Sequence, residues 1–314
     1  MKTRVIHQTW KTKDLPQEYA GFAESIRALH PGFDYRLWTD EDNRELIRTS
    51  YPWFLPVYDA YKHEIERVDA VRYFILYSYG GIYIDLDMEC LKPLNDLLPD
   101  GKAYFSLEAG PAIQNQVVSN AFMASDPGNG FFHHIMTHLE SFKTSDITFR
   151  DVFNNTGPDM VTRQYLQHRD RFEIGIIGLD EICPLKVLRE HPRLRDHDLA
   201  DIRRNRRLHL IHHNTESWNI QADPPERAPA GYELYLSHDI PGFDIDYVEH
   251  RDGDLRRIKA ACDENPDAVG FNYNGYVKGV GGKLRRVESG GSWLKPGKIP
   301  WVCVKKTVSA SSLS

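Results

Sequence analysis

The sequence has few cysteines and no long hydrophobic run. Its four cysteines, Cys90, Cys183, Cys262 and Cys303, are widely separated and lack the paired spacing of a zinc site or a disulfide framework. We therefore expect reduced thiols. The apolar run near the start of the chain, "RVIHQTW", is too short for a signal peptide or a membrane anchor. These absences predict a chain without a transmembrane segment, located in the cytoplasm.

The chain also lacks a strong excess of one charge. It has 39 basic and 45 acidic residues, which gives a net charge of −6. An imbalance this small provides no electrostatic footprint for nucleic acid, so we expect no nucleic-acid partner. Two basic clusters, "RRNRR" (203–207) and "KLRR" (283–286), are short and typical of solvated surface. Hydrophobic residues make up 41% of the sequence, which is enough for a globular core.

The first ninety residues show the pattern of an α/β domain. Residues 3–10 and 33–40 are predicted strands, and the segment between them has helical periodicity, so the chain opens as β-α-β. A single helix is expected over about residues 57–79, ending at a pair of glycines. The run "IYIDLDME" (82–89) follows at once and is predicted to be one continuous strand.

The pattern continues to about residue 220. Strands are predicted at 103–108 and 117–125, and a helix is predicted at 129–143. The segment "NTGPDMVTRQYLQ" (154–167) is predicted to be a loop that leads into a helix, with Thr156 as its N-cap.

A proline-rich stretch marks a domain boundary. The segment "QADPPERAPAG" (221–231) has three prolines and no apolar periodicity. We therefore expect an α/β domain over residues 1–222, a linker over 223–232 and a small α+β domain over 233–314.

Two aspartates inside an otherwise apolar strand are the main functional signal. Side chains two positions apart in a strand share a face, so Asp85 and Asp87 are expected to point together. Two like charges in such a position need a compensating cation or hydrogen-bond donors. Oxygen ligands suit Mg²⁺ or Mn²⁺, which also bind diphosphate oxygens. Taken alone, such a pair more often marks a strand end that emerges into solvent.

The surroundings of the pair are more specific. Asp69 and Arg72 lie three apart on the preceding predicted helix, hence on one face. Together, "DAVRYFILYSYGGIYIDLDMEC" (69–90) resembles the signature of the DXD-containing glycosyltransferases of the Och1-like sugar-transferase family, related to the catalytic domains of the large clostridial glucosylating toxins. Four further segments match the family in the expected order: "VIHQTWK" (5–11), "LWTD" (37–40), "NNTGPDM" (154–160) and "HHNTESW" (212–218).

The resemblance implies a GT-A fold, a Rossmann-like α/β sandwich around a mostly parallel sheet. It also implies a metal-dependent retaining transfer of a hexose from a UDP- or GDP-sugar to a glycan or another hydroxyl acceptor. The nucleotide-sugar is expected at the carboxyl ends of the strands, as in open α/β sheets generally. Mn²⁺ or Mg²⁺ and Arg72 would stabilise the departing diphosphate, whose oxygen would help to deprotonate the acceptor in a front-face transfer.

The family motif also implies roles for individual residues. Asp87 would bind the metal directly, whereas Asp85 would contact the donor and reach the metal through water. Asp69 and Arg72 would hold the sugar and phosphate side of the donor. The remaining donor-binding residues implied by the motif are Thr9, Trp10, Tyr83, Thr156, Gly157, Ser217 and Trp218.

One histidine of the pair His212 and His213 is expected to complete the metal shell. Neighbouring residues of a strand face opposite ways, so only one of the two can be a ligand. Glu216 could supply a carboxylate instead. The sequence does not choose among the three.

Other interpretations were weighed against this one. "IYIDLDMEC" could be the nucleophile strand of a haloacid-dehalogenase-like phosphatase, although its position deep in the chain and the residues after it fit poorly. A non-catalytic nucleotide-sugar or glycan-binding protein is a further alternative. His134 and His138 have the spacing of a zinc pair but lack the glutamate that should follow His134.

The C-terminal segment has a weaker signal. "AACDENPDAVGFNYNGYVKG" resembles small PAN or apple modules, but Ala268 stands where their second cysteine is expected. Its aromatic residues could bind an acceptor glycan or could fill the core of a small domain. These residues are Phe271, Tyr273, Tyr276, Trp293 and Trp301.

Overall fold

The computed structural model describes most of the first 214 residues and shorter pieces of the rest. The described residues are 2–99, 101–109, 116–141, 151–184, 202–214, 228–229, 232–236, 238–239, 244–247, 255–272, 276–279, 285–286 and 301–305. The chain divides into two compact units, residues 1–215 and 216–314.

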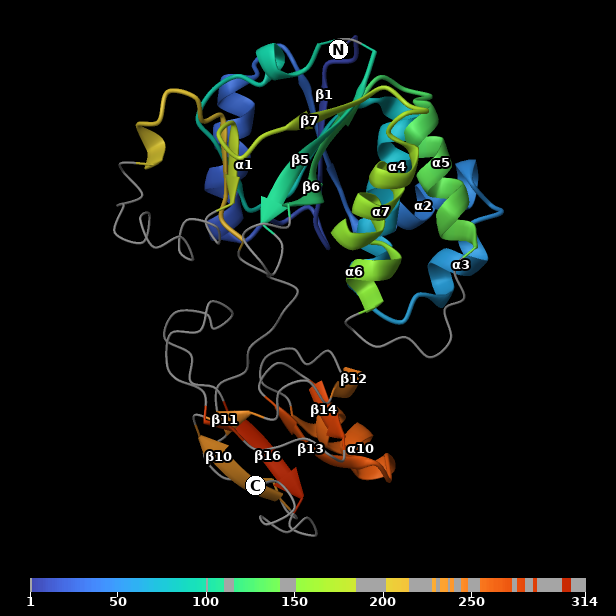
Figure 1. The fold of residues 1–314 in the computed structure, drawn as a ribbon, viewed down its shortest axis with the longest axis vertical. Helices are drawn as coiled ribbons and strands as arrows, with labels where there is room; N and C mark the ends of the chain where they lie inside the picture. The colour runs from blue at the N-terminus through green and yellow to red at the C-terminus, as the bar shows by residue number, and fades with distance from the viewer. Residues whose placement is uncertain are drawn as a thin grey trace. The chain divides into compact units, whose positions relative to one another are not determined.

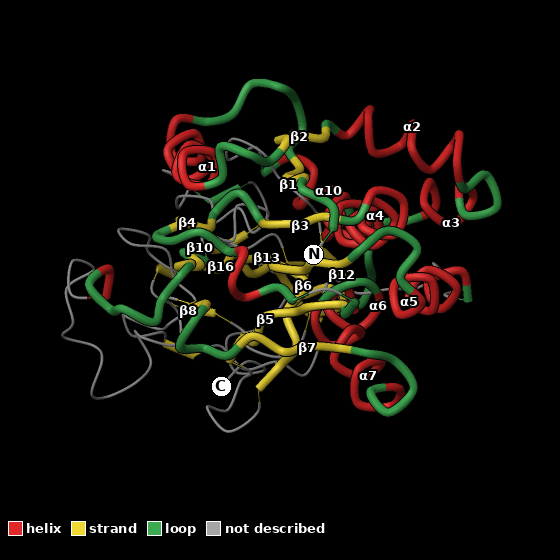
Figure 2. The backbone as a smooth tube through the Cα atoms, turned by 90° about the horizontal axis from the view of Figure 1, so that it is seen from above, coloured by secondary structure: helices red, strands yellow, loops and turns green. Residues whose placement is uncertain are grey.

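A six-stranded sheet forms the centre of the N-terminal unit. Its strands are β1 (Val5–Thr9), β2 (Asp34–Trp38), β3 (Gly81–Ile84), β5 (Ala103–Ala109), β6 (Gln116–Ser125) and β7 (Ile174–Ile177). They lie in the order β2-β1-β3-β6-β5-β7, which can be followed in Figure 2. All neighbouring pairs are parallel except those of β6, which runs antiparallel to β3 and to β5. The predicted α/β class is confirmed.

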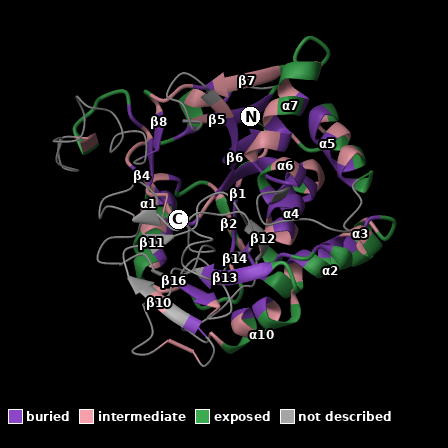
Figure 3. Cartoon of the chain, turned by 60° about the horizontal axis from the view of Figure 1, so that its bottom comes forward, coloured by how far each residue is buried: buried purple, intermediate pink, exposed green. Residues whose placement is uncertain are grey.

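Helices cover both faces of this sheet (Figure 1). Helix α1 (Gln17–Leu29) lies on one face, and α4 (Glu64–Tyr79), α5 (Gly130–Glu140) and α7 (Pro158–His168) lie on the other. Three shorter or more peripheral helices, α2 (Asp40–Ser50), α3 (Leu55–Ala60) and α6 (Asp151–Asn155), accompany the second group. Most of α4 is buried, as Figure 3 shows, and its buried residues include the charged Glu66, Asp69 and Arg72.

The single helix predicted over residues 57–79 is wrong, since the structure has two helices there, α3 and α4. The chain leaves the helical conformation between Tyr61 and His63, and α4 begins with a capping box. In that box the Glu66 carboxylate accepts a hydrogen bond from the His63 backbone nitrogen at 3.2 Å. The capping box therefore starts a new helix at a place where apolar periodicity alone predicts a continuous one.

A second, three-stranded sheet begins directly after the two aspartates. It contains β4 (Met88–Cys90), β8 (Ile182–Pro184) and β9 (Leu210–His212) in the order β4-β9-β8, and η1 (Asn95–Leu97) follows β4. The continuous strand predicted over 82–89 is therefore wrong. β3 ends at Ile84, and a turn closed by the Met88 nitrogen and the Asp85 carbonyl oxygen at 3.2 Å redirects the chain into the other sheet. Asp85 and Asp87 lie in this connection.

His7 joins three parts of the main sheet. The Trp38 indole nitrogen on β2 donates to His7 Nδ1 at 3.0 Å, so the ring proton is on Nε2, which donates to the Gly80 carbonyl oxygen at 2.9 Å. The side chain is buried, and burial lowers the pKa of His7 to about 4. A neutral imidazole thus ties β1 and β2 to the turn that starts β3.

In the residues that the structure describes, the C-terminal unit contains an antiparallel sheet and one helix. Its strands are β10 (Tyr232–Leu236), β12 (Asp244–Tyr247), β13 (Ala268–Asn272), β14 (Tyr276–Gly279) and β16 (Trp301–Lys305), in the order β10-β16-β13-β14-β12, with α10 (Arg256–Glu264). β11 (His238–Asp239) and β15 (Arg285–Arg286) form a separate pair. Phe271 is buried against Tyr232 in the core of this unit, so its ring is not presented to a glycan.

None of the helices in the described part of the chain combines the length and the apolar character needed to span a membrane.

The buried neutral His7 predicts a pH-dependent stability. In the unfolded chain His7 takes up a proton below about pH 6.5, whereas in the folded protein it stays neutral down to about pH 4. Its contribution is therefore complete above pH 6.5 and is lost as the pH falls toward 4. Between pH 7 and 5 the free energy of unfolding of the wild type should fall by about 2 kcal/mol more than that of His7→Gln. Urea unfolding of both proteins measures this, and parallel pH curves would contradict it.

The start of β3 predicts a steric cost at Gly81. Gly81 and Gly101 share a φ of 89°, but an added Cβ would collide with the Val5 carbonyl oxygen at Gly81 and meets nothing within 4 Å at Gly101. Gly101→Ala should cost only the left-handed strain, about 1–2 kcal/mol. Gly81→Ala should lose about 1–3 kcal/mol beyond that through overpacking. Equal losses in urea unfolding would show that the contact with Val5 relaxes freely.

Candidate functional site

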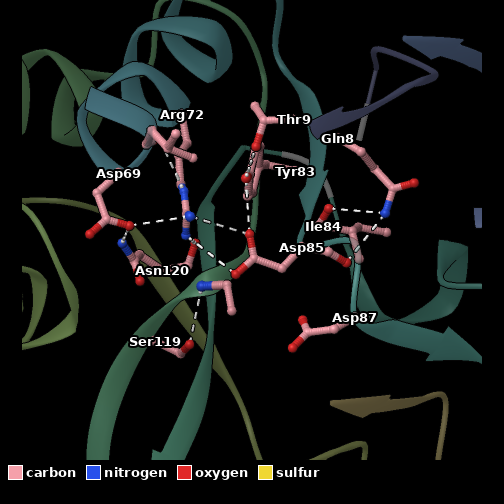
Figure 4. Close-up of polar contacts among 12 residues, drawn as sticks. Gln8, Thr9, Asp69, Arg72, Tyr83, Ile84, Asp85, Asp87, Ser119 and Asn120 are labelled. Carbon is pink, nitrogen blue, oxygen red and sulfur yellow. Dashed lines mark hydrogen bonds and ion pairs between the residues drawn. The ribbon is translucent and has the colours of Figure 1, made fainter. Parts of the chain in front are cut away.

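The candidate site lies where β1 and β3 end. These two strands are parallel neighbours, so their carboxyl ends meet at one edge of the sheet. β1 ends at Thr9 and β3 ends at Ile84, directly before Asp85. Figure 4 shows the residues that gather there from β1, β3, β6 and α4.

A buried arginine lies at the centre of this group. Arg72 Nη2 is 3.2 Å from Asp69 Oδ1 and 3.4 Å from Asp85 Oδ1, so the guanidinium bridges two carboxylates (Figure 4). Its Nη1 donates to the Asn120 carbonyl oxygen at 3.0 Å and to Asp85 Oδ2 at 3.4 Å. The Arg72 side chain is only 5% exposed, and that of Asp85 is 25% exposed. Asp85 is therefore the carboxylate of the pair that a ligand can reach.

Burial and Arg72 shift the pKa values of these carboxyls in opposite directions. Burial raises the pKa of Asp85 to about 6, against the pull of Arg72, and the neighbouring Asp87 carboxylate adds to the rise. Burial also raises the pKa of Asp69, and Arg72 again opposes the shift. The carboxylates of Asp69, Asp85 and Asp87 outnumber the single Arg72 guanidinium, which favours a further cation at this place.

A chain of hydroxyl groups fixes the Asp85 carboxylate. The Tyr83 hydroxyl donates to Asp85 Oδ1 at 2.9 Å, and Thr9 Oγ1 lies 2.8 Å from the same hydroxyl. Thr9 and Tyr83, both predicted from the motif, are therefore brought together with Asp85. Trp10 is half-buried, and its ring packs 5.2 Å from that of Tyr19.

Gln8 was not predicted as a site residue, yet it holds the backbone of the aspartate turn. Its amide nitrogen donates to the carbonyl oxygens of Ile84 and Asp85 at 3.2 and 3.3 Å. Its amide oxygen accepts a hydrogen bond from the Tyr35 hydroxyl at 2.7 Å. The signal in the sequence was a polar residue in the middle of a buried strand.

Asp87 and His212 complete a group that could hold a metal ion. Ligand atoms of Asp85, Asp87 and His212 lie within 4.8 Å of one another, and this is the only such group of three in the part of the chain that the structure describes. His212 Nε2 is 3.2 Å from Asp87 Oδ1. Although burial alone would lower the pKa of His212, the carboxylates of Asp87 and Glu108 raise it well above its usual value. The three carboxylates of Asp85, Asp87 and Glu108 favour positive charge here, either as a proton on His212 or as a metal ion that would bind two oxygens and, in place of that proton, one ring nitrogen.

This donor set could hold either of the two metals expected, with a preference for one of them. Carboxylate oxygens suit both Mg²⁺ and Mn²⁺, whereas an imidazole nitrogen is a better ligand for the transition metal. The residues present therefore favour Mn²⁺.

The structure separates the two neighbouring histidines. His213 Nε2 lies 3.0 Å from Glu89 Oε2, and its ring stacks on Phe22 at 4.3 Å. Glu89 also binds Arg203 through both oxygens. Alternation along β9 thus directs His212 to the aspartates and His213 to a structural ion-pair cluster.

Asp69 is held by residues from two distant segments. Asn120 Nδ2 donates to Asp69 Oδ1 at 3.0 Å, and Thr156 Oγ1 donates to Oδ2 at 3.4 Å. A Cβ on Gly157 would lie 3.4 Å from the same Oδ2, so this position lets the backbone approach the carboxylate closely. The N-cap role predicted for Thr156 is wrong, because Gly157 precedes α7 and Thr156 is turned inward onto Asp69.

A register shift in β6 supplies several of these contacts. The pairing of β5 with β6 changes between Phe105–Met123 and Leu107–Val118, and the extra residues of β6 include Ser119, Asn120 and Ala121. The Asn120 carbonyl oxygen accepts from Arg72, and the Ala121 carbonyl oxygen accepts from the Asp85 backbone nitrogen at 2.8 Å. No local motif marks this irregularity, which explains why Asn120 was not predicted.

Three predicted residues cannot be placed. Glu216, Ser217 and Trp218 lie outside the described residues.

The N-terminal unit matches a known protein family. Residues 16–104 match the profile described as "Glycosyltransferase sugar-binding region containing DXD motif". This range contains Asp69, Arg72, Asp85 and Asp87. The match contradicts the phosphatase interpretation of the strand.

Two curated relatives support the match. Inositol phosphoceramide mannosyltransferase 3 of Schizosaccharomyces pombe is 43% identical over 156 residues, which cover 49% of this chain and 42% of the relative. A mannosyl phosphorylinositol ceramide synthase of Saccharomyces cerevisiae is 38% identical over 188 residues, which cover 59% of this chain and 48% of the relative. The matched region thus spans less than half the length of these relatives.

A solved structure named PaToxG Glycosyltransferase has a TM-score of 0.42 and 16% identity, covering 53% of this chain and 69% of that one.

The expected cytoplasmic location is wrong. The relatives act, by name, on inositol phosphoceramide or form its mannosylated product, and ceramides are lipids of membranes. This acceptor class points away from a cytoplasmic protein. The prediction depended on the absence of an apolar segment in this sequence. That absence gives no information about where an enzyme meets its substrate.

The α/β sheet with its aspartate turn, together with the family match, confirms the expected GT-A fold class. Residues 16–104 of the N-terminal unit are thus similar to the sugar-binding region of the DXD-motif glycosyltransferases.

Proposed function

We propose that the N-terminal unit transfers a hexose from a nucleotide-diphosphate sugar to a hydroxyl acceptor, with retention of configuration and with Mn²⁺ or Mg²⁺ bound. The observation that carries this proposal is the group of Asp85, Asp87 and His212 beside the buried pair of Arg72 and Asp69. Metal ligands and a fixed positive charge at the carboxyl ends of parallel strands suit a diphosphate.

Asp87 and His212 would hold the cation, with Asp85 at its inner side. When bound, the cation supplies Lewis-acid stabilisation of the negative charge that develops on the departing diphosphate. Arg72 keeps the Asp85 carboxylate charged and oriented despite its burial. Because the Asp69 side chain is only 8% exposed, Asp85 offers the donor more carboxylate surface.

Retention is proposed to occur by a front-face transfer. The described carboxylates at the site already have partners: Asp69 and Asp85 bind Arg72, and Glu108 lies 3.1 Å from His212. Such engaged groups are poorly suited to act as a covalent nucleophile. The bond between the anomeric carbon and the diphosphate oxygen would break while the acceptor oxygen bonds to that carbon. The acceptor proton would pass to the departing diphosphate oxygen.

The names of the relatives suggest the transferred sugar and the acceptor. Both relatives are mannosyl-transferring enzymes for an inositol-containing sphingolipid. We therefore propose mannose as the hexose, carried by UDP or GDP, and a hydroxyl of an inositol-phosphate lipid as the acceptor. The earlier expectation of a glycan acceptor becomes the comparison in the assay.

Nucleotide release from a panel of UDP- and GDP-sugars tests the proposal. With Mn²⁺, release should occur from one mannose donor and should rise when inositol phosphoceramide in detergent is added in place of a soluble mannoside. EDTA should abolish it. The double variant Asp85→Asn/Asp87→Asn should lose at least about 10²-fold in rate, because it removes electrostatic stabilisation of the transition state. Asp96→Asn, a change of the same type at an exposed position, should leave the rate unchanged.

The outcomes separate the parts of the proposal. Full activity of the double variant, with unchanged metal dependence, would refute the assigned site. Binding of UDP or GDP without release from any donor, even with acceptor, would favour the non-catalytic alternative.

The neighbouring histidines give a second prediction. His212→Ala should weaken Mn²⁺ binding by about 10-fold or more because it removes a ligand, whereas His213→Ala should change it little. Electron paramagnetic resonance of free Mn²⁺ measures both affinities at one pH. Greater weakening in the His213 variant would reverse the assignment of the ligand.

A further inference from the structure

A glutamate that the sequence motif did not mark lies behind the metal-binding histidine. Glu108 is on β5, its side chain is 23% exposed, and its Oε1 lies 3.1 Å from His212 Nδ1. The opposite ring nitrogen, Nε2, faces Asp87 at 3.2 Å. The imidazole is therefore held between two carboxylates, and the aspartate side belongs to the proposed metal group.

The two ring nitrogens have different possible roles. A metal can bind only a nitrogen that carries no proton, so a metal on Nε2 requires the proton on Nδ1. A carboxylate facing Nδ1 selects that tautomer, fixes the plane of the ring and makes Nε2 a stronger ligand. Glu108 occupies this position.

Asn214 is the competing partner of the same nitrogen. Its amide nitrogen lies 3.2 Å from His212 Nδ1. An amide nitrogen can only donate, so this contact would require Nδ1 without a proton, whereas the Glu108 carboxylate only accepts and forms a charge-assisted bond with Nδ1–H. Glu108 is therefore the stronger of the two partners.

The fold holds Glu108 in place through the irregular part of the sheet. Glu108 follows the register shift between β5 and β6, directly after the Leu107–Val118 pair. His212 and Ser119, which belongs to the extra residues of β6, both lower the pKa of the Glu108 carboxyl against the effect of burial. Without the shift, a different residue of β6 would face Leu107, so the shift determines which side chains lie beside Glu108.

We propose that Glu108 is a positioning residue that prepares His212 Nε2 for the metal. This inference rests on the proposed metal-dependent function and assigns a role to a residue outside the DXD motif. Glu108 acts through His212 and not as a ligand itself.

Direct titration of Mn²⁺ into the full chain, followed by the electron paramagnetic resonance signal of the free ion, tests the proposal. Glu108→Gln should weaken Mn²⁺ binding by about 10- to 100-fold. Glu89→Gln is the matched control, because it changes the glutamate that faces the neighbouring His213. Its Mn²⁺ affinity should stay within about threefold of the wild type, because Glu89 pairs with His213 and Arg203 and not with the proposed ligands. Thermal unfolding of both variants reports whether they are folded.

A double-mutant cycle separates positioning from ligation. If Glu108 acts through His212, adding Glu108→Gln to His212→Ala should produce no further loss of affinity. An equal loss with and without His212 would make Glu108 a ligand or a general electrostatic contributor, and would overturn the proposal. Unchanged affinity of Glu108→Gln, or a larger loss in Asn214→Ala, would also overturn it.

Failure of the proposed function gives a different result. If wild-type protein binds Mn²⁺ and loses it in Asp85→Asn/Asp87→Asn, the metal site stands whatever Glu108 does. If the wild type binds no Mn²⁺, the metal site and the role of Glu108 fall together.

Discussion

The burial of one positive charge organises the site. Arg72 lies almost entirely out of water, which is tolerable only because two carboxylates and a backbone carbonyl surround it. Each of these partners comes from a different place: Asp69 from the same helix, Asp85 from the end of β3, and the carbonyl of Asn120 from β6. Satisfying one guanidinium therefore fixes a helix, a strand end and an irregular strand relative to one another.

The irregularity of β6 is the second constraint. A regular antiparallel strand would direct its carbonyl groups only to its neighbours in the sheet. In the shifted region, the backbone instead binds Arg72 and the Asp85 turn, while the Asn120 side chain donates to Asp69 and Ser119 lowers the pKa of Glu108 together with His212. Because the β6 backbone binds both Arg72 and the Asp85 turn, a change in the conformation of β6 would move both.

Sequence reasoning found the parts of the site whose chemistry is local. The aspartate pair, Asp69 with Arg72 and the β-α-β opening all follow from spacing or apolar periodicity. The break between Ile84 and Met88 did not, because an apolar run with alternating acids looks the same whether or not the strand changes sheets. Asn120 and Glu108 depend on a register shift set by pairing between strands, and Gln8 depends on a backbone turn far along the chain. Such features arise from tertiary structure and leave no periodic trace.

The interrupted strand has a mechanical consequence. Asp85 directly follows β3 of the large sheet, and His212 is the last residue of β9 in the small sheet. Asp87 lies in the short connection between β3 and β4. A cation shared by these three side chains would act as a cross-link between the sheets. Its binding energy would resist any sliding of one sheet past the other, so the stiffness of the small sheet and the occupancy of the site become linked quantities.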